Sequence, residues 1–413
     1  MENVVVIGAG IIGASAALRL AQRGMRVRIV DGAPPGTGCS FGNAGLIAVD
    51  HVAPLASPET IANLPRMLLR RDSPLRLHKR SLPRMAPWLL EFAAQAQRPR
   101  FRRNTRALAS LVSGAAQAWR RLLDGHVPAE LFRDIGSLYV FEQPVARATE
   151  RAQLDLFERH GVRYVDLTAD QVRRDYLPSL TPHVSHARYF PGMASVTNPQ
   201  QVVERIFDAA LAAGANFTNA AVETLRPLTD GRIDVTLNGE TYVADKVLIA
   251  AGSRSAVLAQ QLGARIPLTN ERGYHVQLAA PSRDTLRVPV SFVERGFTCN
   301  PMTHGIRLAG TVELGARGEP DWRRADLLAT QFHKLFPGES APRIESRWYG
   351  ERPTLPDYLP MIGEMRGARN VFLATGHQHL GLTLGPLTGE LAAQLMAREA
   401  PAVDLAPFRI DRF

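Results

Sequence analysis

A glycine-rich segment near the N-terminus places the strongest constraint on the fold. Val4-Val5-Val6-Ile7 is an apolar run typical of a buried strand, and Gly8-Ala9-Gly10-Ile11-Ile12-Gly13 follows it directly. We expect a helix from about Ile11 to Arg23. Between a strand and a helix, the first glycine permits a tight turn, the second lets the backbone approach a pyrophosphate, and the third lets the helix pack on the strand. The segment therefore predicts a Rossmann-type site that binds a dinucleotide at a helix N-terminus.

An acidic residue at the end of the next apolar run supports this interpretation. Val27-Arg28-Ile29-Val30 reads as the second strand, and Asp31 ends it, eighteen residues after Gly13. A carboxylate there can accept hydrogen bonds from a ribose 2′-hydroxyl, which disfavours the 2′-phosphate of NADP. The motif alone does not distinguish NAD from FAD.

Two later segments favour FAD. The run Val247-Leu248-Ile249-Ala250-Ala251-Gly252 is an apolar strand that ends in small residues, so it can pass close beneath a pyrophosphate. Near the C-terminus, the strand Asn370–Thr375 leads into a glycine-studded turn and a helix from about Pro386 to Ala397. The start of such a helix can stabilise negative charge on a reduced flavin. A nicotinamide-dependent reductase remains the alternative.

The length of 413 residues suits two interleaved domains. From Leu268 to about Leu314, strand-like and turn-like sequence alternates, which predicts a second, antiparallel sheet. The expected fold is mixed α/β: a Rossmann-type FAD-binding domain interleaved with an antiparallel-sheet substrate domain. We expect the FAD-binding domain to comprise residues 1–50, 190–265 and 345–413, and the substrate-binding domain to comprise residues 51–189 and 266–344.

Composition argues against several other classes of protein. Only two cysteines occur, Cys39 and Cys299, so neither a disulfide scaffold nor a cysteine-based metal site is expected, which fits a reducing cytoplasm. The histidines have no spacing typical of a metal site, so we expect no metal. The uncharged stretch Val4–Leu18 has no basic residue before it and contains three glycines, so we interpret it as strand, turn and helix instead of a targeting segment.

Four blocks, taken together, resemble the FAD-dependent D-amino acid oxidase-type family: Val5–Gly13 with Asp31, Thr37–Gly45, Val247–Ser253, and Tyr349–Gly363 with Gly376–Gly389. That family includes D-amino acid dehydrogenase, glycine oxidase, sarcosine oxidase and D-hydroxyproline dehydrogenase, and the resemblance covers nearly the whole chain. The block Ser40–Gly45 is similar to the dehydrogenase branch, in which this loop wraps the flavin ring. Motif and resemblance together predict these cofactor-binding residues: Gly8, Ala9, Gly10, Ile11, Ile12, Gly13, Asp31, Ser40, Asn43, Ala44, Gly45, Val222, Ala251, Gly252, Gly376, His377, Leu380, Gly381, Leu382 and Thr383.

The resemblance also implies residues that contact the substrate. Tyr349–Asp357 resembles the family's G-x-R-P-x-x-x-D signature, whose arginine binds the substrate carboxylate, and this makes Arg352 the best candidate. The alternative is that Arg352 pairs with Glu351 or Asp357 and holds a turn. No cysteine lies between Trp348 and Gly363, so we expect FAD to be bound non-covalently.

Three further side chains are candidates with structural alternatives. Tyr274 begins the expected second sheet, where the resemblance places a residue that roofs the substrate pocket; the alternative is an ordinary sheet aromatic. His377 and His379 lie in the turn expected at the flavin edge, where either can reach flavin or substrate, or be solvated. We name Arg352, Tyr274 and His379 as catalytic candidates. His51, just past the flavin loop, is a weaker candidate, and no base is identified from sequence.

Basic residues are concentrated in one segment. Between Arg66 and Arg106 there are twelve basic residues, opposed by Asp72 and Glu91, so this segment carries a net charge of +10, as does the whole chain. Leucines and aromatic residues are interspersed, as in segments that lie on an anionic membrane surface. A solvated basic helical excursion is an equally good interpretation, and nucleic-acid binding is disfavoured because no reader motif accompanies the charge.

We therefore expect an FAD-dependent amine dehydrogenase. Its substrate is a small D-amino or cyclic imino acid, with a preference for cis-4-hydroxy-D-proline, because Glu271–His275 and Leu382–Pro386 are most similar to the D-hydroxyproline dehydrogenase branch. Its electron acceptor is expected to be a quinone or the respiratory chain, and its location the cytoplasm or the inner face of the membrane. The alternatives are a general D-amino acid dehydrogenase, a glycine- or sarcosine-type oxidase, and a flavin-binding subunit of a larger complex.

Overall fold

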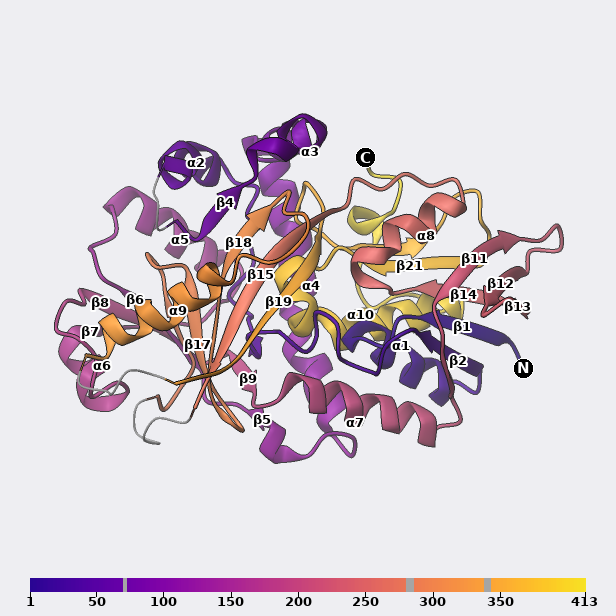
Figure 1. Ribbon diagram of the computed structural model, residues 1–413, viewed down its shortest axis with the longest axis horizontal. Helices are drawn as coiled ribbons and strands as arrows, with labels where there is room; N and C mark the ends of the chain where they lie inside the picture. Colours follow the sequence, from indigo (N-terminus) through magenta and orange to yellow (C-terminus); the bar gives the residue numbers. More distant parts are fainter. Residues whose placement is uncertain (70–72, 280–285, 338–342) are drawn as a thin grey trace.

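Two large sheets organise the fold, as Figure 1 shows for this computed structural model, which describes residues 1–69, 73–279, 286–337 and 343–413. The first sheet has six strands in the order β10-β2-β1-β14-β21-β20. Its strands are β1 (Asn3–Ile7), β2 (Arg26–Asp31), β10 (Asn216–Asn219), β14 (Lys246–Ile249), β20 (Met361–Glu364) and β21 (Val371–Thr375).

The first sheet is parallel except at β20, and helices or a small sheet cover both of its faces. In β1, Val4 and Val6 face a core shared with α1 (Ile11–Gln22), α7 (Pro199–Ala212) and α10 (Gly381–Met396). Val5 and Ile7 face the opposite core, shared with α8 (Ser255–Gln261) and three antiparallel strands: β11 (Val222–Pro227), β12 (Ile233–Leu237) and β13 (Glu240–Ala244). Burial on both faces explains why the parallel strands are continuously apolar.

The second sheet has nine strands, mostly antiparallel, and confirms the expected second sheet. One of its faces packs on α9 (Trp322–Leu335) and a core that includes Val276, Phe292 and Phe332. Its strands are β4 (Leu75–Leu77), β6 (Ser137–Phe141), β7 (Val165–Thr168), β8 (His186–Phe190), β15 (Thr269–Leu278), β16 (Val290–Phe292), β17 (Phe297–Met302), β18 (Gly305–Leu314) and β19 (Ile344–Thr354).

The chain passes between the two sheets several times, and one expected boundary needs correction. Residue 345 was expected to open the last part of the FAD-binding domain. Strand β19 instead pairs with β15 in the second sheet from Ile344 to Thr354, so a division by sheets falls after Thr354. The small sheet β3 (Leu46–Ile47), β9 (Ala194–Val196) and β5 (Phe132–Arg133) lies at the junction of the two halves. Two domains divided in this way remain our proposal.

Helices occupy most of the basic segment, and the first two of them lie at one edge of the molecule (Figure 1). They are α2 (Pro58–Leu69), α3 (Leu82–Gln95) and α4 (Arg98–Leu123), and the short strand β4 interrupts them by pairing with β18. Arg70, Arg71 and Asp72 lie outside the described residues. No helix in the described ranges is long and apolar enough to span a bilayer. The remaining helices are α5 (Arg147–Arg159) and α6 (Ala169–Asp175).

Helix α10 starts earlier than the sequence predicts. We expected it to begin near Pro386, but it begins at Gly381 and contains that proline. A proline inside a helix removes one N–H, so the carbonyl of the residue four positions earlier loses its partner. Here the indole Nε1 of Trp119, from α4, donates to the Leu382 carbonyl at 3.2 Å. Because a distant helix satisfies that carbonyl, the first turn of α10 can form ahead of the proline.

Candidate active site

A cavity of about 590 Å³ lies where the carboxyl ends of the parallel strands meet the second sheet. Crevices at this end of parallel strands are the usual ligand sites of such folds. Of the twenty cofactor-binding residues expected from sequence, fourteen line the cavity: Gly8, Gly10, Ile11, Ile12, Asp31, Ser40, Asn43, Ala44, Val222, Ala251, Gly252, His377, Gly381 and Leu382.

The other six expected residues do not line the cavity. They are Ala9, Gly13, Gly45, Gly376, Leu380 and Thr383. Two of them support its wall. A Cβ on Gly45 would lie 2.7 Å from the Val196 carbonyl oxygen, and the Thr383 hydroxyl accepts from the Ala48 N–H at 3.0 Å. Gly45 and Thr383 therefore maintain the shape of the cavity wall and do not themselves line the cavity.

The glycine turn forms a cradle that fits a dinucleotide. Gly8 has φ +113°, and a Cβ there would lie 2.4 Å from the Ala250 carbonyl oxygen. A Cβ on Gly13 would lie 1.8 Å from the Gly8 carbonyl oxygen, so helix α1 packs directly on the turn. A Cβ on Gly10 would meet only the Ser40 hydroxyl, at 3.3 Å, and Gly10 borders the cavity at the N-terminus of α1. The residues present thus leave room for a pyrophosphate at a helix N-terminus.

Asp31 has a structural role beside its expected contact with a ribose. Its carboxylate accepts from the Ala9 N–H at 2.8 Å and from the Ala33 N–H at 3.0 Å, and it also lines the cavity. The same side chain therefore holds the glycine turn and presents acceptor oxygens to a bound nucleotide.

Three side chains from the second sheet hold the loop Ser40–Gly45 by its carbonyl groups. His275 Nδ1 lies 3.2 Å from the Gly42 oxygen, and Asn300 donates to the Ala44 oxygen at 2.9 Å. Arg307 donates to the oxygens of Phe41 and Asn43 at 2.8 and 2.9 Å. Sequence analysis missed all three, because nothing in their local sequence indicates contact with a loop more than 230 residues away.

Burial sets the protonation of two of these groups. It lowers the pKa of His275 to about 3, with Arg307 contributing to the shift, so His275 is neutral and can donate from Nδ1 to Gly42. Burial also lowers the pKa of Arg307 to about 10, which leaves it cationic at neutral pH. The loop is therefore held by two neutral groups, His275 and Asn300, and by one charged donor, Arg307.

Arg352 lies on the face of β19 that borders the cavity, together with Trp348 and Gly350. Gly273 pairs with Gly350, and a Cβ on Gly273 would lie 2.3 Å from Nη2 of Arg352. The guanidinium thus lies across the absent side chain of Gly273. Bare backbone on both strands makes room for an arginine that reaches into the cavity.

The pairings considered as an alternative for Arg352 are made by other residues. Asp357 accepts from Arg412 at 2.7 and 3.1 Å, and Glu351 accepts from Arg272 at 3.2 Å. Within the described part of the chain, no hydrogen bond or ion pair of the Arg352 guanidinium is recorded. Its fork is available for a carboxylate ligand.

The expectation that Tyr274 contacts substrate is corrected by the alternation of β15. Gly273 and His275 face the cavity side, so Tyr274 points to the opposite face, towards α9. Its hydroxyl donates to Glu313 at 2.7 Å and accepts from the Asp321 N–H at 3.1 Å. Burial, followed by the bond to Glu313, raises its pKa to about 12. A shift of one residue along a strand exchanges the two faces.

The two histidines before α10 have different surroundings. His377 is buried and its Nε2 lies 2.9 Å from the Thr388 hydroxyl; burial lowers its pKa to about 3. His379 borders the cavity with its ring 5.1 Å from that of His51. The structure thus brings His379, His51 and Arg352 to one cavity.

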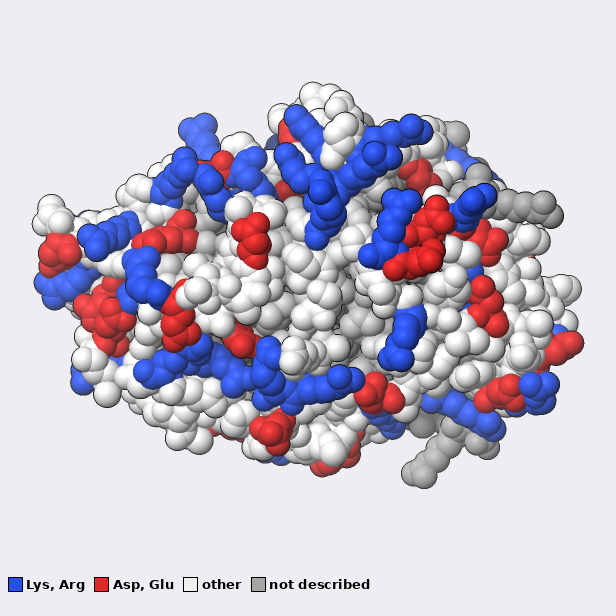
Figure 2. Space-filling model, turned by 180° about the vertical axis from the view of Figure 1, so that it is seen from behind, with Lys and Arg blue, Asp and Glu red and all other residues white. Residues whose placement is uncertain are grey.

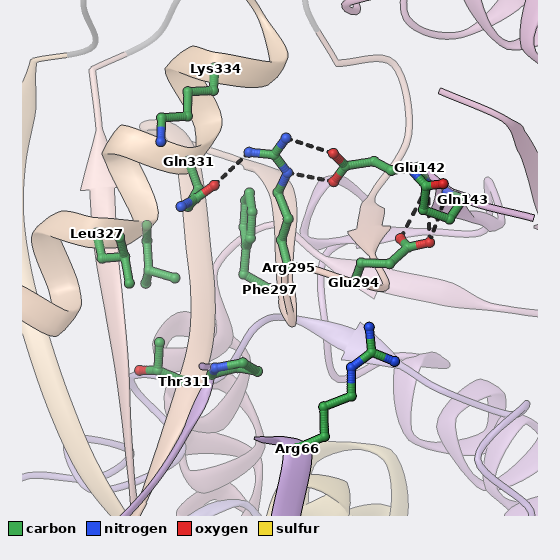
Figure 3. Close-up of a pocket in the computed structure, with 12 residues that line it drawn as sticks. Arg66, Glu142, Gln143, Glu294, Arg295, Phe297, Thr311, Leu327, Gln331 and Lys334 are labelled. Carbon is green, nitrogen blue, oxygen red and sulfur yellow. Dashed lines mark hydrogen bonds and ion pairs between the residues drawn. The ribbon is translucent and has the colours of Figure 1, made fainter. Parts of the chain in front are cut away.

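A second cavity, of about 420 Å³, lies on the α9 side of the second sheet. Figure 3 shows Arg295 held between Glu142 and Gln331, and Glu294 turned towards the backbone of residues 142 and 143. Arg295 is thus paired with Glu142, and Glu294 accepts from the backbone N–H groups of Glu142 and Gln143. The cavity shares no lining residue with the glycine turn, so the larger cavity is the candidate active site.

Comparison with known proteins agrees with this geometry. Residues 3–395 match the model of the family described as FAD dependent oxidoreductase. The chain is 31% identical to a D-amino-acid oxidase of Bradyrhizobium diazoefficiens (100% of this chain, 99% of the relative) and 33% identical to D-amino acid dehydrogenase 2 of Ralstonia nicotianae (99% and 100%). Among solved structures, it resembles glycine oxidase from Geobacillus kaustophilus (TM-score 0.77, 24% identity, 100% of both chains) and L-proline dehydrogenase from P. horikoshii (TM-score 0.77, 18% identity, 100% and 97%).

The chain therefore belongs to the FAD-dependent oxidoreductase family. Within it, the protein is an oxidoreductase of the D-amino acid oxidase and dehydrogenase type, and its cofactor is FAD. The glycine turn, Asp31, the loop Ser40–Gly45 and the start of α10 would hold FAD in the larger cavity. When bound, FAD accepts two electrons from the substrate.

Proposed function

We propose that this protein is a dehydrogenase that oxidises the Cα–N bond of a D-amino acid or cyclic imino acid, with cis-4-hydroxy-D-proline as its preferred substrate and a pyrroline carboxylate as product. The observation that carries the proposal is Arg352, whose guanidinium reaches the FAD cavity with no partner recorded among the described residues. A planar, bidentate donor suits a carboxylate. The relatives named D-amino acid dehydrogenase support the amino-acid class.

We assign three roles within this proposal. Arg352 anchors the substrate carboxylate and thereby fixes Cα relative to the flavin. The loop Ser40–Gly45 and the start of α10 enclose the ring, and the positive end of the α10 dipole stabilises charge on it. His379 borders the substrate side of the cavity. Tyr274 has no role in contact with substrate in this assignment.

We further propose that FAD is bound non-covalently. Cys39 is the cysteine that lines the cavity, and its thiol donates to the Glu351 carbonyl at 3.0 Å. The other cysteine, Cys299, is buried in the core of the second sheet. Neither arrangement favours a thioether to the flavin.

The electron acceptor in this proposal is a quinone or the respiratory chain, reached at the inner face of the membrane. Basic side chains line one edge of the molecule over α2–α4 (Figure 2). Among them, Leu90 is 72% exposed and Leu82 is 37% exposed. A helix that exposes leucine among arginines suits the interface of an anionic bilayer.

Anaerobic reduction of the flavin by a panel of amino acids tests the proposal. The panel contains cis-4-hydroxy-D-proline, D-proline, D-alanine, glycine, sarcosine and the L-enantiomers. We expect the flavin absorbance to bleach fastest with cis-4-hydroxy-D-proline. Faster reduction by D-alanine would indicate a general D-amino acid dehydrogenase. Reduction by glycine or sarcosine alone would indicate a different amine substrate. Absence of bleaching with every amine would overturn the proposal.

A further inference from the structure

Two imidazoles form one wall of the active-site cavity. His51 follows β3, and His379 lies in the 3-10 turn Gln378–Leu380 that leads into α10. More than 320 residues separate them in sequence, yet their rings lie 5.1 Å apart and nearly perpendicular, at 78°. Both border the cavity that Arg352 enters.

A buried carboxylate and a phenol lie behind this pair. The Asp50 side chain is 2% exposed, and its Oδ1 lies 4.0 Å from Nδ1 of His51. The Tyr139 hydroxyl lies 3.5 Å from Nε2 of His51. Among the described residues, neither Asp50 Oδ1 nor His51 Nδ1 has a hydrogen-bond partner. A buried carboxylate oxygen without a partner is costly, and the ring of His51 lies beside it.

Different charged and titratable groups face the two imidazoles, so His379 and His51 have different roles. Arg352 from β19 and His51 face His379; burial, then these two groups, hold the pKa of His379 well below its usual range. His379 is therefore a neutral proton acceptor at neutral pH. Asp50, Tyr139 and His379 face His51. Burial, then Asp50, raise the pKa of Tyr139 well above its usual range, so the phenol stays protonated.

We propose that His379 removes the proton from the substrate's ammonium group and that His51, backed by Asp50, positions the ring of His379. The inference rests on the proposed function, in which Arg352 holds the substrate carboxylate. The ammonium N–H bond breaks, its electron pair stays on nitrogen, and a new N–H bond forms on the imidazole. The neutral amine is the form whose lone pair can become the C=N bond as two electrons leave. His379 is the catalytic residue, and His51 is a positioning residue that acts through it.

The rate of flavin reduction as a function of pH tests this step. Holoenzymes carrying His379→Asn and His51→Asn are compared with His183→Asn, which makes the same change at an exposed position outside the cavity. For His379→Asn we expect kcat/KM at pH 7 to fall about 10²- to 10⁴-fold, the usual range for a lost general base. We also expect the acidic side of the profile of kcat/KM against pH (the acid limb) to move towards the pKa of the free substrate ammonium. At high pH the difference should shrink. For His51→Asn we expect a smaller shift in the same direction, and for His183→Asn none.

Two further measurements distinguish a base at His379 from a merely structural role of this residue. In His379→Gly, added imidazole should restore flavin reduction at pH 7. In wild-type holoenzyme with histidine labelled by ¹⁵N, binding of 2-aminoisobutyrate, which has no Cα–H to lose, should convert His379 from imidazole to imidazolium. An unchanged acid limb, a loss equal at every pH, or an imidazole that stays neutral in the complex would overturn the inference. Wild-type flavin that no amine reduces at any pH would instead contradict the proposed function.

Discussion

At the scale of single residues, the absent side chain of a glycine decides whether the arginine can act. Arg352 reaches the cavity by lying over Gly273, and its neighbours Asp357 and Glu351 are engaged by Arg412 and Arg272. Its availability for a ligand thus depends on partners chosen elsewhere in the chain.

Replacing Arg352 by lysine should weaken the binding of the substrate and leave FAD in place. Lysine keeps the charge but loses the planar fork, at a cost of about 1.5–3 kcal/mol, or ten- to a hundred-fold in kcat/KM. The measurement is steady-state turnover together with FAD content from absorbance. Unchanged kcat/KM at full FAD content would assign Arg352 to structure instead.

Gly273→Ala should produce a similar defect although it changes no polar side chain. The new Cβ would lie 2.3 Å from Nη2 of Arg352, and a flexible side chain can move aside, so the protein should fold while the guanidinium is displaced. We expect KM to rise about ten-fold, the effect of losing roughly one charge-assisted hydrogen bond. Gly363→Ala is the matched control, because nothing lies within 4 Å of a Cβ there. Equal KM values for the two variants would contradict this account.

At the scale of elements, the site is assembled from strand ends and helix starts. The turn between β1 and α1, the loop Ser40–Gly45 and the start of α10 supply the walls, and side chains of β15, β17 and β18 hold the loop in place. The edge formed by α2–α4 carries the basic surface.

Gly10→Val should prevent FAD binding. Its side chain would project from the N-terminus of α1 into the cavity, where a pyrophosphate would lie, although the turn itself has space for a Cβ. Purified wild-type protein should carry FAD that acid releases, and the variant should be colourless with an unchanged circular dichroism spectrum. Flavin that remains attached to the denatured wild-type protein would refute non-covalent binding.

Neutralising two arginines of the basic surface should weaken binding to anionic vesicles. Arg80 and Arg84 are exposed beside Leu82 and Leu90. At about 1 kcal/mol per basic residue, Arg80→Gln with Arg84→Gln should lower vesicle affinity about 30-fold at low salt. Co-sedimentation with vesicles that contain phosphatidylserine, an anionic lipid of such surfaces, measures this.

The matched control for that experiment is Arg226→Gln with Arg232→Gln, two exposed arginines of which the first lies in β11 and the second directly precedes β12. High salt should weaken wild-type binding, because the attraction is screened. Wild-type protein that does not sediment with vesicles at low salt would reduce the basic surface to a solvated face or a surface for a protein partner.

At the scale of the whole molecule, two halves enclose one cavity, and the electron acceptor must reach the flavin between them. A basic edge studded with leucine has no evident use in an enzyme that reacts freely with oxygen. We therefore expect turnover with a quinone analogue or redox dye to exceed turnover with oxygen at least ten-fold. Oxygen-electrode and dye-reduction assays on the same preparation measure the ratio. Rapid production of peroxide would refute the dehydrogenase assignment.

Local sequence is enough to predict the features that depend on neighbouring residues. The glycine turn with Asp31, the continuous apolar strands and the antiparallel second sheet follow from local pattern, because turn geometry and two-sided burial leave direct marks on sequence. Arg352 was found through the resemblance of its signature. Fourteen of the twenty cofactor-binding residues predicted from the sequence line the cavity.

Other features depend on contacts between distant segments, and these appear only in the folded protein. The face of Tyr274 follows from the register of β15, the start of α10 depends on an indole from α4, and His275, Asn300 and Arg307 reach a loop far away in sequence. The pairing of His51 with His379 likewise arises where two loops meet. No local pattern indicates such contacts, because each segment forms its own secondary structure independently of its partner. The packing of the sheets and helices then decides which segments come into contact.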